Sequence, residues 1–227
     1  MSDLRAAFAF LKELEENNNR EWFHANKNQY EKAKAAVLDF GQSVLVELAQ
    51  VDISLQSLEI KNCLFRINRD IRFSKDKSPY KNHFGLNFVA GGKKSLLAGY
   101  YLHLSPSETF IACGNYLPET TILKGIREEI DYCLEEWEEI LQDKHFVESF
   151  GKELAYTSEM KLSRPPKGYT VDNPAIDYLK YKGFVVVKSY RGEEVYTPTF
   201  LEDVRTCLAS GVRFVQFLNR PFDSSAT

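Results

Sequence analysis

The chain has 227 residues, of which 44% are hydrophobic and 27% charged, and this composition excludes a disordered, collagen-like or disulfide-stapled protein. The formal net charge of -3 excludes a uniformly basic nucleic-acid binder but leaves room for a local basic surface. A chain of this length buries enough surface for one hydrophobic core, so we expect a single domain over residues 1–227.

The N-terminal part, residues 1–50, predicts a pair of helices. Apolar residues recur at helical spacing over 4–14, with Asp3 as a candidate N-cap, and a run of three asparagines favours the end of this helix. A second apolar stripe follows over 22–48. With Asn19 as its cap, it predicts one long helix that ends near Ala49.

Residues 59–116 show the short apolar or alternating runs that are typical of β-strands. The turn segments between the later runs are short, and such turns join only antiparallel neighbours. The predicted strands cover residues 60–67, 84–90, 97–104 and 109–116.

Residues 117–227 are predicted to be mostly helical, with a fifth strand at 184–190. The predicted helices are 123–141, 146–154, 174–182 begun by Asn173, and a closing helix that starts at a capping box in Thr199-Phe200-Leu201-Glu202 and is interrupted by Gly211. The expected fold class is therefore α+β, with an antiparallel sheet of four to five strands packed against amphipathic helices.

Charge is distributed unevenly along the chain. Residues 61–94, which we call the basic segment, carry nine Lys and Arg against two Asp, a balance of +7 (9 minus 2). Residues 117–143 carry nine acidic residues against two basic ones, or -7 (2 minus 9), and are interpreted as the solvated face of a helix. The basic segment is the more specific signal, because cations that repel one another need carboxylates or an outside anion nearby.

The basic segment predicts an anion-binding site. Guanidinium groups pair bidentately with phosphate or carboxylate, and nearby hydroxyl groups add donors. The proline-stiffened loop at 164–168 offers two further cations, and His103 is either a general base or a structural imidazole. The candidate ligand-binding residues are Arg66, Arg69, Asp70, Arg72, Lys75, Lys77, Tyr80, Lys81, Tyr101, His103, Arg164 and Lys167.

We expect Arg66, Arg69 and Arg72 to lie within one concave surface that Lys75 or Lys81 also reaches. Arg164 or Lys167 is expected at the same rim, with Tyr80, Tyr101 or His103 supplying polar or aromatic contacts. The alternative is a set of internal ion pairs, for example Arg69 with Asp70 or Arg72 with Asp76, and it carries equal weight.

No motif identifies a reaction, a metal or a tightly bound cofactor. The sequence has no Walker A loop, no dinucleotide fingerprint and no Gly-x-Ser-x-Gly elbow, and its histidines lack metal-ligand spacing. The four cysteines form no Cys-x-x-Cys pair, and neither a signal peptide nor a membrane span is evident. We therefore expect a cytoplasmic protein with reduced thiols and no cofactor.

Several segments combine polar and aromatic residues in distinctive patterns: Asn18-Asn19-Arg20-Glu21-Trp22-Phe23, the block 66–81, Gly99-Tyr100-Tyr101-x-His103 and Arg164-x-Pro166-Lys167-Gly168-Tyr169. Together they resemble a family known as domain of unknown function 2461, and the resemblance runs from about Phe10 to Phe184. It implies a single-domain protein of mixed helix and antiparallel sheet. It supplies no substrate, cofactor or catalytic residue.

Three functions remain open from the sequence. The first is binding of a phosphate-bearing small molecule by the basic residues. The second is an interaction module whose basic segment docks on an acidic partner or on the acidic helix of a second copy. The third, nucleic-acid binding, is less favoured because the whole chain is acidic. The sequence does not specify the oligomeric state.

Overall fold

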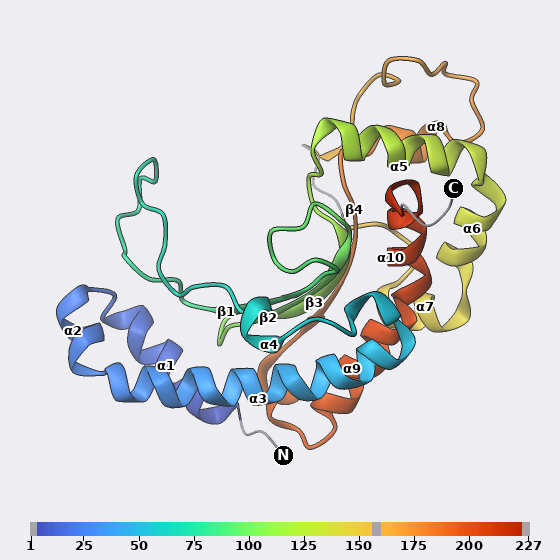
Figure 1. The fold of residues 1–227 in the computed structure, drawn as a ribbon. Coiled ribbons are helices and arrows are strands. Elements are labelled where there is room, and N and C mark those ends of the chain that lie inside the picture. The colour runs from blue at the N-terminus through green and yellow to red at the C-terminus, as the bar shows by residue number, and fades with distance from the viewer. Residues whose placement is uncertain (1–3, 156–159, 224–227) are drawn as a thin grey trace. The chain divides into compact units, whose positions relative to one another are not determined.

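The structure is a computed structural model that describes residues 4–155 and 160–223 (Figure 1). It confirms the α+β class: helices accompany one antiparallel sheet in which the strands lie in sequence order, β1-β2-β3-β4. The strands are β1 (Phe84–Phe88), β2 (Gly99–Leu104), β3 (Thr109–Asn115) and β4 (Phe184–Tyr190). Each strand therefore pairs with the next strand along the chain, as short turns require for the first three.

The chain folds into two compact units. The first unit contains the residues up to Lys93, Tyr101–Ile111 and Ser189–Arg205. The second unit contains Lys94–Tyr100, Ala112–Lys188 and the residues from Thr206 onward. Three strands, β2, β3 and β4, contribute residues to both units. Whether the chain behaves as a single domain stays a prediction.

The N-terminal part of the chain forms three helices rather than the predicted pair. They are α1 (Arg5–Glu16), α2 (Arg20–Ala25) and α3 (Lys27–Val51). The Asn19 side chain accepts a hydrogen bond from the Trp22 amide at 2.9 Å, which confirms the predicted cap. The prediction of one long helix is wrong because the Asn26 side chain donates to the Trp22 carbonyl at 2.9 Å and ends α2. The Asp3 cap lies outside the described residues.

The first unit buries one face of α1 and one face of α3. Gly41 lies on the buried face of α3, where an added Cβ would stand 2.9 Å from the side chains of Ile60 and Leu86. Helix α3 therefore approaches β1 and the short helix α4 (Ile60–Cys63) more closely than a side chain permits. The other short helices of this unit are η1 (Ile53–Leu55) and η3 (Gly192–Tyr196).

The predicted strand at 60–67 is wrong. Its first half forms α4, because a short apolar run satisfies helical spacing as well as strand alternation. Its second half makes only isolated pairing: Leu64 bridges Leu86, and the Phe65 amide donates to the Gly85 carbonyl at 2.9 Å. This fragment leads directly into the basic segment.

The second unit packs its helices around Trp137, which is fully buried. The Trp137 ring contacts Phe184, Phe214 and Phe217 at centroid distances of 5.8, 5.4 and 5.2 Å. The helices are α5 (Thr120–Tyr132), α6 (Leu134–Gln142), α7 (Lys144–Phe150), α8 (Ile176–Leu179), α10 (Val212–Asn219) and η4 (Arg220–Phe222), while α9 (Phe200–Ser210) has residues in both units.

Several helix predictions for the C-terminal half need correction. The single helix at 123–141 is two helices, which break at Cys133, where the backbone adopts φ -116° and ψ 43°. The helix predicted at 146–154 ends at Gly151, whose φ of +80° stops it. The helix begun by Asn173 is also wrong: the Asn173 side chain accepts from the Ala175 amide at 2.7 Å, but Ala175 is the N-cap of α8, which is only four residues long. No helix among residues 4–155 and 160–223 is long and apolar enough to cross a membrane.

Candidate functional site

Between α4 and β1 the basic segment forms a long loop, drawn in teal in Figure 1. We call residues 66–81 the basic loop. Its two ends are tied together by backbone hydrogen bonds, from the Arg69 amide to the Pro79 carbonyl at 2.9 Å and from the Lys81 amide to the Ile67 carbonyl at 2.8 Å. The loop is therefore anchored at its base.

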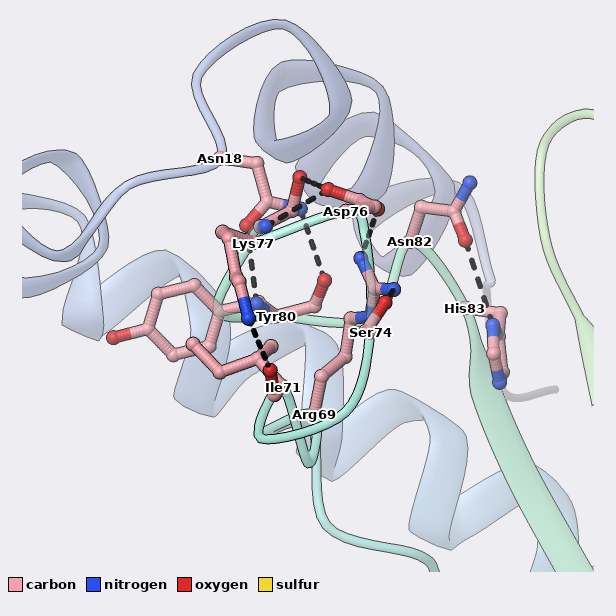
Figure 2. Close-up of polar contacts among 10 residues, drawn as sticks. Asn18, Arg69, Ile71, Ser74, Asp76, Lys77, Tyr80, Asn82 and His83 are labelled. Atoms are coloured by element: carbon pink, nitrogen blue, oxygen red, sulfur yellow. Dashed lines mark hydrogen bonds and ion pairs between the residues drawn. The ribbon is translucent and has the colours of Figure 1, made fainter.

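Asn18 fixes this base to the turn between α1 and α2 (Figure 2). Its side chain donates to the Tyr80 carbonyl at 3.0 Å and accepts from the Tyr80 amide at 3.1 Å. The Tyr80 ring stacks on Phe23 with centroids 4.0 Å apart and is buried. The two motifs noted in the sequence, the Asn-Asn-Arg-Glu-Trp-Phe run and the basic block, thus meet in the first unit.

Two arginines of the basic loop are held by aspartates of the same loop. Arg69 pairs with Asp76, and Arg72 pairs with Asp70 through hydrogen bonds of 2.9 and 2.6 Å (Figure 2 shows the Arg69 pair). Hydrogen bonds from Ser78, followed by the Arg69 guanidinium, hold the pKa of Asp76 well below its usual range. The internal ion pairs considered above thus exist for both arginines, with the two aspartates exchanged.

Lys81 ends the basic loop and differs from the other cations. It is half-buried, and burial together with the charge of Arg66 lowers the pKa of its ammonium group. Its Nζ atom lies 5.4 Å from the centroid of the Phe65 ring. Among the described residues no ion pair joins Lys81 to a carboxylate. Arg66, Lys75 and Lys77 also take part in no ion pair among the described residues, but they are exposed, whereas the charge of Lys81 is partly buried.

Beside Lys81, two imidazoles and a phenyl ring form a stack. The centroids of His83 and His103 are 4.1 Å apart, and those of His103 and Phe110 are 4.6 Å apart with nearly parallel planes. The Tyr101 hydroxyl lies 3.2 Å from Nδ1 of His103. Burial and the nearby Lys81 charge lower the pKa of each histidine to about 4, with the His103 charge also acting on His83. Both imidazoles are therefore neutral near pH 7.

Strand alternation explains why these rings share a face. In β2 the residues Tyr100, Leu102 and Leu104 are buried, whereas Tyr101 and His103 point to the other face and stay half-exposed. On β1, a Cβ at Gly85 would stand 2.5 Å from the Tyr101 hydroxyl. A side chain at position 85 would therefore displace the Tyr101 ring from this position.

A groove of about 420 Å³ opens between the end of α1 and the basic loop, a size within the range of small-ligand sites. Its carboxylates are Glu15 and Asp76, and Asp76 is already bonded to Arg69 and Ser78. The groove is lined by Glu15, Asn18, Arg69, Asp76, Ser78, Tyr80, Lys81, Asn82 and His83.

Only part of the predicted set lines this groove, namely Arg69, Tyr80 and Lys81. Tyr101 and His103 lie on the adjoining ring face, and Arg66 acts on Lys81 through its charge. The exposed part of the loop holds Asp70, Arg72, Lys75 and Lys77, the last bonded to the Ile71 carbonyl at 2.9 Å. Arg164 and Lys167 are exposed residues of the second unit, and their approach to the groove stays a prediction.

Sequence reasoning missed three contributors: Asn18, His83 and the half-exposed Phe110. His83 lacks metal-ligand spacing, yet its position two residues after Lys81, at the start of a strand, is a usable signal. The bonds of Asn18 to Tyr80 could not be predicted from its motif, because they span 62 residues.

The site combines a cation with neutral groups that can form hydrogen bonds. Burial raises the pKa of Tyr101 to about 12, so its hydroxyl is protonated near pH 7. The two neutral imidazoles offer hydrogen-bonding nitrogens, and Lys81 offers a cation without a carboxylate. Within the described residues, no group of three or more His, Cys, Asp or Glu side chains is placed to hold a metal.

Comparison with known proteins gives one informative result. Neither the curated proteins nor the solved structures include a match to this chain. A family model described as conserved hypothetical protein (DUF2461) matches residues 6–217, which is nearly the whole chain. The chain therefore belongs to the DUF2461 family, as the motifs around Asn18, the basic loop and His103 indicated.

Proposed function

We propose that this protein binds a phosphate-bearing small molecule in the groove, with Lys81 as the principal cation. The observation that carries the proposal is Lys81 itself: a half-buried ammonium group that faces Arg66 and two imidazoles and has no carboxylate in an ion pair. A cluster of this kind costs free energy when empty, and an anion offsets that cost.

The surrounding groups suit a phosphate. Lys81 supplies a point charge, and the Asn82 amide and His83 imidazole lie on the same groove wall. Arg69 also lines the groove, so it becomes a second phosphate ligand if Asp76 releases it. The four cysteines are free thiols, which fits the cytoplasm, where we place this binding activity.

The test is calorimetric titration of the protein with inorganic tripolyphosphate at moderate salt. Replacing Lys81 with Met keeps the stem of the side chain and removes the charge, and we expect affinity to fall about tenfold or more, or roughly 1.4 kcal/mol. Lys32→Met is the matched control, because Lys32 is an exposed lysine of α3 outside the groove. Equal affinity in wild type and Lys81→Met, or no binding at all, contradicts the proposal.

A second candidate is docking of the basic loop on an acidic surface, and one observation favours it. Phe73 is 96% exposed beside Arg72, whose guanidinium carbon lies 5.9 Å from the Phe73 ring centroid. An exposed aromatic next to arginines is typical of binding hot spots. If a second copy is the partner, sedimentation should detect a dimer at low salt that Phe73→Ser abolishes. A monomer under both conditions rules out self-docking.

A further inference from the structure

We infer that the ligand of the groove carries a planar aromatic ring as well as its phosphate, so that the binding site takes a nucleotide. The inference rests on the proposed function and narrows its ligand class. It comes from the geometry of the ring stack His83, His103 and Phe110 rather than from the cations.

His83 takes part in both the ring stack and the groove. It is the terminal ring of the stack, since among the described residues its only ring contact is with His103. It also lines the groove, together with Lys81 and Asn82. The stack therefore ends at a residue that lines the groove, and we infer that an aromatic ring of the ligand continues the stack there.

The three rings are already arranged as a base-stacking platform. His103 and Phe110 lie nearly parallel, with an interplanar angle of 9°, and His83 follows at 29°. They stand on the half-exposed face of β2 and β3 and at the start of β1. Aromatic side chains on a sheet face, next to cations that hold the backbone phosphates, are a recurring arrangement in the recognition of bases.

The neutral state of the imidazoles suits this role. A protonated histidine would repel Lys81, whereas a neutral ring stacks on a base and still offers nitrogen atoms to its edge. The groups that face the two histidines are Lys81, Tyr101, the Phe110 ring, the Asn82 side-chain oxygen at 3.5 Å from Nδ1 of His83, and each other, with no carboxylate among these contacts. The terminal ring and the cation are two residues apart along the chain, and both residues line the groove, so one ligand spans both.

The experiment compares ATP with inorganic tripolyphosphate, which carry the same number of phosphates but differ in the ring. We expect wild-type protein to bind ATP about tenfold more tightly than tripolyphosphate. His83→Leu replaces the ring with an aliphatic side chain of similar bulk and should remove this preference, so that ATP and tripolyphosphate bind to this variant with affinities within about twofold of each other. His83→Phe restores an aromatic ring and should restore the preference for ATP. Far-ultraviolet circular dichroism verifies that both variants are folded.

The outcomes separate the inference from the proposed function. If tripolyphosphate binds and ATP binds equally well, the nucleotide inference fails and the anion site stands. If neither binds, the proposed function fails as well. A single-stranded oligonucleotide of five bases that binds about tenfold more tightly than ATP, with affinity falling steeply as salt rises, contradicts a mononucleotide site and assigns the platform to nucleic acid.

Discussion

His83 and His103 link the site to the stability of the fold. Burial holds both pKa values at about 4, below the 6.5 of a free imidazole. Between these values the unfolded chain binds protons that the folded chain does not. Above about pH 7 both histidines are neutral in the folded and the unfolded chain, and their titration does not oppose folding. As pH falls from 6.5 toward 4, protonation of the unfolded chain lowers the free energy of unfolding.

We expect the free energy of unfolding to drop by about 2 kcal/mol from this source between pH 7 and pH 4.5, after allowing for solvent screening of the half-exposed rings. Urea unfolding of wild type and of a double variant, His83→Gln with His103→Gln, measures the effect. The variant should lose less stability over the same pH interval, because it lacks the two titrating groups. Equal losses in both proteins would show that the imidazoles titrate normally.

Features of the candidate site could be predicted from sequence where they involve neighbours in the chain, and not where they depend on distant residues. The cations of the basic loop could be recognised from sequence because they are neighbours in the chain. Their partners could not be assigned: Arg69 reaches Asp76 rather than Asp70, since the hairpin-like closure of the loop brings residue 76 back toward residue 69. The role of Tyr80 in the core depends on Phe23, a contact across 57 residues (80 minus 23) that no local pattern encodes.

The effect of the basic loop on anion affinity can be tested by substituting its aspartates. Asp76→Asn removes a groove carboxylate and releases Arg69, so tripolyphosphate affinity should rise by about threefold to tenfold. Asp70→Asn is the control, because Asp70 pairs with the exposed Arg72 and does not line the groove. Affinity is measured by calorimetric titration. If Asp76→Asn binds tripolyphosphate more weakly than wild type, the ion pair of Asp76 with Arg69 is needed to shape the site.

The pairing of β3 with β4 depends on one glycine. Gly114 has a φ of +124°, and a Cβ there would stand 2.0 Å from the Phe184 carbonyl oxygen. Gly114→Ala should therefore lower the free energy of unfolding by more than about 3 kcal/mol, through both backbone strain and a clash that separates the strands. Gly92→Ala is the control, since Gly92 has a φ of +82° but open space around it, and should cost about 1 kcal/mol. Equal costs in urea unfolding would show that the strands adjust without loss.

Helices and strands could be predicted where the apolar pattern of the sequence allows only one kind of element. The strand at 184–190 was located to the residue because its Val-rich run is flanked by Gly183 and by an Arg-Gly pair. The strand predicted at 60–67 was wrong because so short an apolar run fits a helix as well as a strand. The helix breaks at Asn26 and Cys133 were missed because the apolar pattern continues across both residues. Side-chain bonds such as that of Asn26 decide such breaks, and they are specific to the folded backbone.

At the scale of the whole molecule, the chain divides into two compact units, and three strands contribute residues to both. A strand that serves both units cannot lose its pairing in one part without shortening the sheet for the other. We therefore expect the chain to unfold in one cooperative transition, as a single domain should.

Two tryptophans make this expectation testable, because Trp22 lies in the first unit and Trp137 in the second. In a Trp22→Phe background, fluorescence reports only on the burial of Trp137. Adding Asn18→Ala removes both hydrogen bonds to the Tyr80 backbone, which should cost the first unit about 1–3 kcal/mol. If the units unfold together, the urea midpoint read from Trp137 shifts by the full amount that circular dichroism records. A Trp137 midpoint that does not move would establish two independently folding domains, because damage to the first unit would then leave the second intact.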